Sequence, residues 1–212
     1  ILFDLDGTLA DTLDDIAACG NHMVQAFGRA PLPRDRYRYL AGQGARALVR
    51  EALGLPDDDP RVETGLRLFR EYQLAHGMDR TRPYPGVPEL LDELTRRGCR
   101  MAVLSNKPHA ATVAMIEQRF GRWHFDAVRG QRDGYPLKPD PMEALAIAAE
   151  VGIPPSDWLY VGDTRVDMLT ARAAGMTAIG VLWGFRDAEE LRQAGAHHLI
   201  AHPSELLVFC RP

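Results

Sequence analysis

Cysteine is scarce in this 212-residue chain, and its few occurrences follow no pattern. Cys19, Cys99 and Cys210 lie far apart, form no CxxC pair and are odd in number. Neither a zinc site nor a disulfide framework is therefore indicated, and a reducing, cytoplasmic setting is expected. The seven histidines also lack HxxxH or comparable metal-binding spacing, so we expect them in ordinary surface or packing roles.

Long apolar runs and an excess of positive charge are also missing. No stretch approaches the roughly 20 apolar residues of a transmembrane helix, and the first residues run into a motif instead of a signal peptide. The missing initiator Met before Ile1 predicts a trimmed N-terminus. A formal net charge of −4 supplies no basic field for nucleic acid or an anionic membrane. We expect neither partner. The sequence contains neither a GxxxxGK[ST] loop nor a GxGxxG segment after a strand, so no nucleotide cofactor is indicated.

Short apolar runs that end in polar or glycine-containing turns do recur, and they predict buried parallel strands. These runs are residues 1–3, 101–104, 159–161 and 178–181. Helical patterns that stop at a glycine lie between and after them, at residues 88–97, 141–151, 166–174 and 188–194. The alternation predicts an α/β fold, a Rossmann-like parallel sheet core with helices on both faces. Such sheets bind ligands at the carboxyl ends of their strands.

The interval from Asp11 to Arg82 interrupts this alternation. It holds helical patterns and no convincing strand; the patterns are residues 13–27, 45–53 and 62–76. We therefore expect an all-helical cap, residues 11–82, inserted after the first strand of a catalytic core formed by residues 1–10 and 83–212. An insertion at this point must sit above the strand end, in the position of a lid.

Acidic residues follow two of the predicted strands. Asp4 and Asp6 belong to the segment DLDGT, and Asp163 follows the strand at 159–161, with Asp167 four residues later. Two carboxylates at the end of an apolar strand repel one another in a packed interior unless a cation or solvent is present. Carboxylates, waters and a substrate phosphate are the ligands that Mg²⁺ prefers. The pattern predicts a magnesium site, although Asp163 is also well placed to cap the following helix.

A hydroxyl and a lysine follow in further segments. Ser105 comes directly after the strand of residues 101–104, and Lys138 precedes the helix of residues 141–151. A phosphoryl group in transfer needs a hydrogen-bond donor and a fixed positive charge. Taken singly, Ser105 would more often cap a helix and Lys138 would more often lie in solvent. Their order and placement favour the phosphate-binding interpretation.

Together these segments resemble the haloacid dehalogenase superfamily over essentially the whole chain. The motifs that carry the resemblance are DLDGT at 4–8, Ser105-Asn106, Lys138-Pro139 and GDTRVD at 162–167. The resemblance implies a Rossmann-like core and a helical cap after the first motif. It further implies that Asp4 is the nucleophile, which forms a phosphoaspartyl intermediate, and that Asp6 is the general acid and base.

The same resemblance implies the remaining parts of the site. Ser105 and Lys138 are expected to bind the phosphate. Mg²⁺ is the expected cofactor, and its expected ligands are Asp4, Asp6 through its backbone carbonyl, Asp163 and Asp167, the last supporting either the metal or Lys138. Further contacts with the substrate are expected from Gly7, Thr8, Asn106 and Arg46.

Three shorter segments resemble the phosphoglycolate phosphatase branch: AGQGARALV at 41–49, SNKP at 105–108 and LWGF at 182–185. Phosphoglycolate carries a carboxylate besides its phosphate, and Arg46 is one candidate to bind it. An equally supported alternative places Arg46 as a solvent-facing residue of the cap. The expected function is a Mg²⁺-dependent phosphomonoester hydrolase, monomeric or homodimeric, whose leading substrate among small phosphorylated metabolites is 2-phosphoglycolate.

Other functions use the same motifs. A phosphosugar mutase similar to β-phosphoglucomutase also needs Asp4 and Asp6, and pyrophosphate, sugar phosphates and nucleoside monophosphates are alternative substrates of a phosphatase. Dehalogenation is disfavoured because dehalogenases of the superfamily lack an acid two residues after the nucleophile. A binding protein that has lost turnover is disfavoured because the set of Asp4, Asp6, Ser105, Lys138 and Asp163 is complete.

Overall fold

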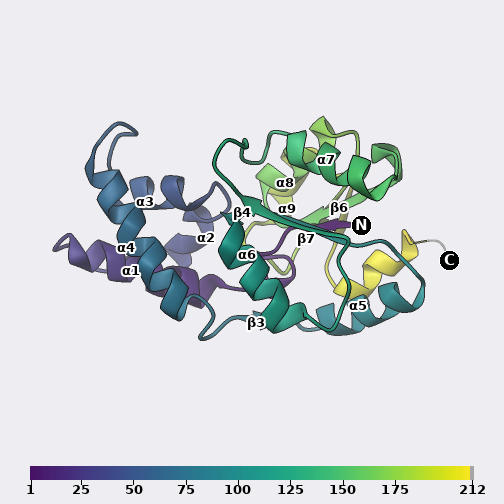
Figure 1. Ribbon diagram of the computed structural model, residues 1–212, viewed down its shortest axis with the longest axis horizontal. Helices are drawn as coiled ribbons and strands as arrows, with labels where there is room; N and C mark the ends of the chain where they lie inside the picture. Colours follow the sequence, from purple (N-terminus) through teal and green to yellow (C-terminus); the bar gives the residue numbers. More distant parts are fainter. Residues whose placement is uncertain (211–212) are drawn as a thin grey trace.

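The computed structural model describes residues 1–210 and consists of two lobes side by side (Figure 1). One lobe contains a parallel sheet and the helices that flank it, and the other is formed by helices α1 to α4. None of the helices in residues 1–210 is long and apolar enough to cross a membrane.

The sheet has six strands in the order β5-β4-β1-β6-β7-β8, and every neighbouring pair runs parallel. The strands are β1 (Leu2–Phe3), β4 (Ala102–Pro108), β5 (Ala127–Gln131), β6 (Leu159–Gly162), β7 (Thr177–Val181) and β8 (His198–Ile200). From β1 the chain builds outward through β4 and β5 and then crosses to the other side for the last three strands. The residues that follow β1 therefore lie at the point where the strand order reverses, which is where open α/β sheets bind ligands.

Helices cover both faces of the sheet, which confirms the predicted α/β fold class. They are α5 (Val87–Arg96), α6 (His109–Met115), α7 (Met142–Val151), α8 (Arg165–Ala173) and α9 (Ala188–Gln193). Because successive strand residues point to opposite faces, Leu2 packs into a cluster with α7, α8 and α9, whereas Phe3 packs with α5 and α6. Each such fully buried side chain contributes roughly 1.5–3 kcal/mol of transfer free energy.

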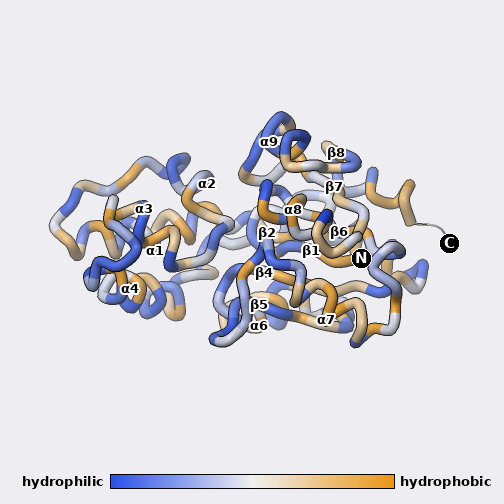
Figure 2. Tube along the Cα trace, turned by 90° about the horizontal axis from the view of Figure 1, so that it is seen from above, coloured by the Kyte–Doolittle hydropathy of each residue, from blue (hydrophilic) through white to orange (hydrophobic). Residues whose placement is uncertain are grey.

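The second lobe has a hydrophobic core of its own. Its helices are α1 (Leu13–Ala26), α2 (Tyr37–Leu40), α3 (Ala45–Leu53) and α4 (Arg61–His76). Buried residues from all four pack together, among them Met23, Tyr37, Leu53 and Phe69. The lobes are also separate when seen from above, where the polar helix α9 marks the outer edge of the sheet lobe (Figure 2).

A two-stranded ladder marks the place where the chain enters and leaves the helical lobe. Strand β2 (Ala10–Asp11) pairs antiparallel with β3 (Arg82–Pro83). Just beyond it, the buried carboxylate of Asp15 accepts hydrogen bonds from the backbone N–H groups of Arg80 and Thr81 and from the Thr81 hydroxyl. These bonds tie the returning chain to α1, since a buried carboxylate needs such partners.

The structure adds elements that the sequence patterns did not predict. Strands β5 and β8 extend the sheet, the pair β2–β3 joins the lobes, and helices α2 and α6 were not anticipated. Both additional sheet strands lie at its edges, and each is weakly patterned: β5 contains Arg129 and Gly130, and β8 has three residues, of which His198 is exposed. Edge strands pair on one side only, and in natural sheets they are often short or carry charged side chains. The remaining short elements are the 3₁₀ helices η1 (Arg34–Arg36), η3 (Pro155–Asp157) and η4 (Pro203–Val208) and the π-helical segment η2 (Ile116–Phe120), which continues α6.

Candidate active site

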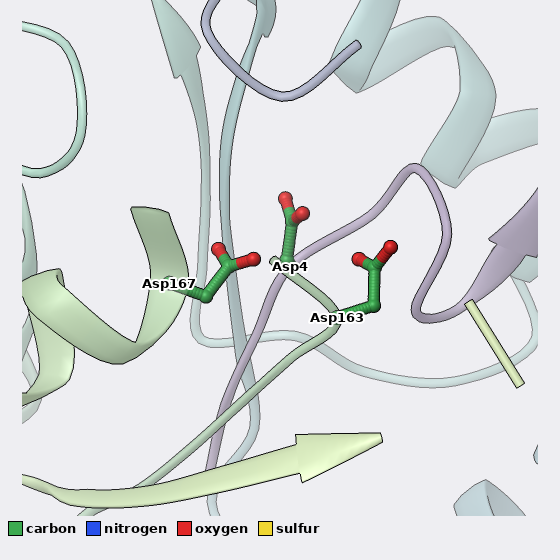
Figure 3. Close-up of side chains that lie close together, drawn as sticks. All are labelled: Asp4, Asp163 and Asp167. Carbon is green, nitrogen blue, oxygen red and sulfur yellow. The ribbon is translucent and has the colours of Figure 1, made fainter. Parts of the chain in front are cut away.

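Three carboxylates converge at the carboxyl edge of the sheet. Asp4 follows β1, Asp163 follows β6, and Asp167 lies in the first turn of α8 (Figure 3). Each contributes an oxygen atom, and these atoms lie within 4.8 Å of one another in a buried space. The parallel register explains the meeting of the first two, because Phe3 pairs directly with Val161.

The three carboxylates repel one another electrostatically. Burial raises the pKa of Asp4 from 3.8 to about 7, with repulsion from Asp167 adding to the effect and Lys138 opposing it. Burial, Asp167 and Asp4 raise the pKa of Asp163 well above its usual value. In addition, Asp4 Oδ1 is buried and faces the ammonium of Lys138 at 2.9 Å as an ion pair. A set of hard oxygen donors as crowded as these three carboxylates fits a bound Mg²⁺ ion.

Asp163 is held rigidly by the loops around it. Thr8 donates its hydroxyl to Asp163 Oδ1 at 2.9 Å, and the backbone N–H of Phe185 donates to Oδ2 at 2.8 Å. Gly7 adopts a φ of +87°, and a Cβ atom there would lie 2.2 Å from Asp163 Oδ2. The DLDGT segment therefore needs glycine both for its turn and for its close approach to this carboxylate.

Asp167 connects the start of α8 to Lys138. Its Oδ2 accepts hydrogen bonds from the backbone N–H of Thr164 at 3.0 Å and from the Thr164 hydroxyl at 2.7 Å, in a capping box. Its Oδ1 accepts from Lys138 Nζ at 2.7 Å. Both Asp167 oxygens are therefore engaged, and the carboxylate supports the lysine as well as the acidic cluster.

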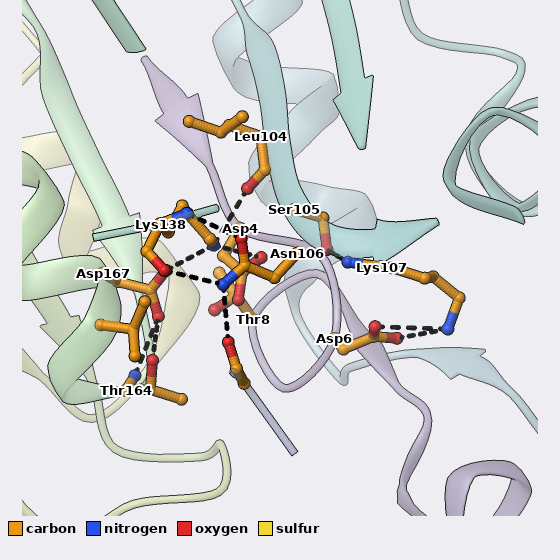
Figure 4. Close-up of polar contacts among 12 residues, drawn as sticks. Asp4, Asp6, Thr8, Leu104, Ser105, Asn106, Lys107, Lys138, Thr164 and Asp167 are labelled. Atoms are coloured by element: carbon orange, nitrogen blue, oxygen red, sulfur yellow. Dashed lines mark hydrogen bonds and ion pairs between the residues drawn. The ribbon is translucent and has the colours of Figure 1, made fainter. Parts of the chain in front are cut away.

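Lys138 is the buried cation of the cluster (Figure 4). Its Nζ lies 2.9 Å from Asp4 Oδ1, 2.7 Å from Asp167 Oδ1 and 3.1 Å from the carbonyl oxygen of Leu104. Burial by itself lowers the pKa of Lys138, but the attraction of Asp167 and Asp4 outweighs burial and raises the pKa well above its usual value. The ammonium is therefore charged, and three acceptors surround its three N–H donors.

Three residues at the end of β4 complete the sheet side of the site. Ser105 is buried, and its Oγ accepts a hydrogen bond from the backbone N–H of Lys107 at 3.2 Å. The amide of Asn106 donates to the carbonyl oxygens of Gly42 at 2.9 Å and Lys138 at 3.1 Å, and its Oδ1 accepts from the Lys138 backbone N–H at 2.9 Å. Asn106 thus links the helical lobe to the loop that presents Lys138.

Asp6 is paired with a residue that the sequence analysis did not single out as a site residue. Lys107 Nζ lies 3.1 Å from Asp6 Oδ1 and 3.2 Å from Oδ2, and Figure 4 shows the Asp6 carboxylate pointing toward this lysine. The available signal was the position of Lys107 at the end of a buried strand, two residues after Ser105. The position of a lysine in a strand does not indicate which carboxylate its side chain contacts.

A cavity of about 50 Å³ lies between the two lobes. Its sheet side is formed by Asp4, Asp6, Ser105, Asn106, Lys107 and Lys138. Apolar side chains of the helical lobe form much of the opposite side, including Ile16, Leu48 and Phe69. The two lobes thus enclose a space in which carboxylates, a hydroxyl and two ammonium groups face a largely apolar wall.

The structure separates the residues predicted to contact a substrate. Asn106 lines the cavity, whereas Gly7 and Thr8 pack against Asp163 behind it. Arg46 is not among the residues that line the cavity; its guanidinium pairs with the carboxylate of Glu63 and donates to the carbonyl oxygen of Asp57 at 3.1 Å. The position of Arg46 therefore agrees with the alternative of an exposed cap residue, because its donors are directed along the outside of the helical lobe.

The sequence places this site in a known family. Residues 1–181 match the model of the haloacid dehalogenase-like hydrolase family. The chain belongs to this family. The match covers the helical lobe, the sheet lobe as far as β7, and the segments that contribute Asp4, Ser105, Lys138, Asp163 and Asp167. The chain is therefore an enzyme of a hydrolase family, and the resemblance seen in its motifs is confirmed.

Two relatives from Pseudomonas aeruginosa show how similar the chain is to named phosphatases. It is 36% identical over 217 residues to phosphoglycolate phosphatase 1, with 98% of this chain and 78% of the relative covered. It is also 36% identical over 209 residues to an N-acetylmuramic acid 6-phosphate phosphatase, with 98% of this chain and 92% of the relative covered. The resemblance to the phosphoglycolate phosphatase branch is confirmed.

Solved structures share the fold over nearly the whole chain. A protein of Lactobacillus delbrueckii subsp. bulgaricus is 29% identical with a TM-score of 0.89, and the superposition covers 97% of this chain and 95% of that one. CbbY from Rhodobacter sphaeroides, solved in complex with phosphate, is 26% identical with a TM-score of 0.79, over 97% of this chain and 94% of that one.

Proposed function

We propose that this hydrolase is a Mg²⁺-dependent phosphatase that removes phosphate from a small metabolite through a phosphoaspartyl intermediate on Asp4. One observation carries the proposal: the carboxylates of Asp4, Asp163 and Asp167 converge on one space beside the ammonium of Lys138. Carboxylates crowded in this way need a cation, and a transferring phosphoryl group needs both positive charge and a nucleophile.

Mg²⁺ would be held by the carboxylates of Asp4 and Asp163 and by the backbone carbonyl of Asp6. Asp167 pairs with the ammonium of Lys138, whereas Asp163 accepts only from neutral donors, so we assign Asp167 mainly to positioning Lys138 and adding negative charge nearby. When bound, Mg²⁺ supplies positive charge that stabilises the oxygens of the phosphoryl group.

The protein groups then have separate tasks. An Asp4 carboxylate oxygen attacks phosphorus, the new oxygen–phosphorus bond forms and the bond to the leaving alkoxide breaks. Asp6, two residues away, donates a proton to that alkoxide. In the second half Asp6 takes a proton from water, whose oxygen attacks phosphorus and releases Asp4. The Ser105 hydroxyl donates to a phosphate oxygen during both halves, and Lys138, held beside Asp4 and Asp167, stabilises the negative charge of the phosphoryl group.

The helical lobe, residues 11–82, acts as a cap in this proposal. It supplies the wall of the cavity that faces away from Asp4, so it contacts the leaving group of the substrate and selects among substrates. We propose 2-phosphoglycolate as the leading substrate, supported by the relatives named for this activity. N-acetylmuramic acid 6-phosphate is the second candidate because a relative of equal identity is named for it. Cytoplasmic location and a monomeric or homodimeric state remain predictions.

Release of inorganic phosphate from a panel of metabolites tests this function. The panel should contain 2-phosphoglycolate, N-acetylmuramic acid 6-phosphate, pyrophosphate, a nucleoside monophosphate and a sugar 1-phosphate. Hydrolysis that needs Mg²⁺ is expected, together with one phosphoryl group on the Asp4 peptide after rapid acid quenching. Conversion of the sugar 1-phosphate to its 6-phosphate isomer without free phosphate would favour a mutase. Absence of any phosphate release by the intact chain would refute the proposal.

A further inference from the structure

Two lysines line the cavity, and only one of them has an acceptor for each of its three N–H donors among residues 1–210. Lys138 is surrounded by Asp4, Asp167 and the Leu104 carbonyl, which match its three N–H donors. For Lys107 Nζ, the partner found among residues 1–210 is the single carboxylate of Asp6. The Lys107 side chain is only 4% exposed and that of Asp6 17%, so the pair lies mostly inside the site.

The wall opposite Asp4 offers little else to a charged group. The helical lobe contributes Ile16, Ala45, Leu48 and Phe69 to the cavity together with Ala41, Gly42 and Gly44 of the turn before α3, and Gln73 is its one polar side chain there. An anionic group buried against such a wall without a partner is strongly disfavoured. A substrate whose leaving group carries a negative charge therefore finds one cation that is not already surrounded by acceptors, Lys107.

On the basis of the proposed phosphatase function, we propose that Lys107 determines specificity by binding a second anionic group on the leaving-group side of the substrate, and that this contact releases Asp6. The substrate class that fits is a phosphomonoester with a carboxylate a few atoms from the ester oxygen. Lys107 acts on the reaction in two ways, because it binds the substrate directly and positions Asp6.

The geometry explains why the two effects are joined. Both oxygens of Asp6 face the ammonium of Lys107, so in this arrangement the carboxylate is directed at the lysine. A carboxylate on the substrate competes with Asp6 for the same N–H donors. When it binds, Asp6 loses this partner, and its carboxyl group is free to turn toward the ester oxygen. A substrate with a neutral leaving group leaves the Lys107–Asp6 pair intact. The two kinds of substrate should therefore differ in kcat as well as in KM.

The test compares two substrates that differ in one group. In 2-hydroxyethyl phosphate a neutral hydroxymethyl group replaces the carboxylate of 2-phosphoglycolate. The ratio of kcat/KM for the two substrates is measured for the intact protein with Mg²⁺, for Lys107→Gln, for Lys107→Arg and for Arg46→Gln. Because the ratio is taken within each variant, any general loss of activity or folded protein cancels.

We expect the intact protein to prefer 2-phosphoglycolate and Lys107→Gln to reduce that preference on the order of 10- to 100-fold, the effect of a charge-assisted hydrogen bond. Lys107→Arg should retain more of the preference, since it keeps the positive charge. Arg50→Gln is the matched control: Arg50 lies on α3 and pairs with Glu51 and Asp57 away from the cavity, so the ratio should not change.

Three results would overturn the inference. An unchanged ratio of kcat/KM in Lys107→Gln would show that Lys107 does not bind the carboxylate of the substrate. A collapse of the ratio in Arg46→Gln instead of Lys107→Gln would assign that role to Arg46. An intact protein that hydrolyses both substrates equally would show that no such selection exists. Failure of the proposed function is distinct, because the intact protein would then release phosphate from neither substrate nor from 4-nitrophenyl phosphate.

Discussion

Gly184 packs directly against Asp163. A Cβ atom on Gly184 would lie 2.3 Å from the Cβ of Asp163 and 2.4 Å from the carbonyl oxygen of Gly7. The next residue, Phe185, donates its backbone N–H to Asp163 Oδ2 at 2.8 Å. The turn after β7 therefore packs against the Cβ of Asp163 at Gly184 and donates a hydrogen bond to its carboxylate from Phe185.

Gly184→Ala should consequently displace Asp163. Because a misplacement of about 1 Å in a catalytic site can cost on the order of 100-fold, we expect a loss of that size in kcat/KM together with weaker Mg²⁺ activation. Gly98→Ala is the control, since Gly98 has a φ of +68° but open space around the Cβ position. It should lose about 1 kcal/mol of stability and keep its kcat. Full activity in Gly184→Ala would contradict the requirement for this position of the Asp163 carboxylate.

The pKa of Asp4 predicts how the metal-free protein responds to pH. Burial raises this pKa to about 7 in the folded protein, whereas the unfolded value is about 3.9. The folded state thus binds the proton more tightly, so the contribution to stability is complete below about pH 4 and is lost as pH rises through about 7. Urea unfolding in a chelator should show this loss, and Asp4→Asn should reduce the dependence while abolishing turnover. An equal pH dependence in Asp4→Asn would contradict the assignment.

Addition of Mg²⁺ should raise the unfolding temperature, and its removal should abolish activity reversibly. Binding to the folded state alone stabilises it by about 2.7 kcal/mol when the ion is present at 100 times its dissociation constant. Asp163→Asn removes one of the three charges of the cluster, so its shift in unfolding temperature should be smaller. Thermal unfolding with and without Mg²⁺ measures this difference. Activity that persists in a strong chelator would exclude a metal requirement.

Arg186 should control how the helical lobe sits on the sheet lobe. Its guanidinium donates to the carbonyl oxygens of Arg38, Tyr39 and Ala41, and Arg38 in turn donates to the carbonyl oxygen of Gly184 at 3.0 Å. Arg186→Gln leaves these acceptors without a charged donor, at a cost of about 1.5–3 kcal/mol. We expect a higher KM and faster proteolysis between the lobes, with Arg50→Gln as control. An unchanged KM would show that these bonds do not hold the lobe.

Much of the site was accessible from the sequence because its determinants are local. The apolar run before Asp4 and the run before Asp163 each predicted a strand, and parallel strands end at the same edge of a sheet. The sequence also suggested that Asp163 caps the following helix, but the N-cap is Thr164, which forms a capping box with Asp167, while Asp163 accepts from Thr8 and Phe185. Glycines after helical patterns marked helix ends, as at Gly152, whose φ is +76°. The α/β class followed from this alternation of short patterns.

Side-chain partners across the fold depended on tertiary structure. Lys107 and Asp6 are 101 residues apart in sequence, and nothing in either segment indicates that they pair. Arg46 was a candidate for the substrate, but the packing of α3 beside α4 directs it to Glu63. Local pattern sets which backbone forms a strand or helix, whereas the direction of a long side chain depends on the neighbours that packing brings to it. That is why the acidic cluster could be predicted and the lysine that faces the leaving group could not.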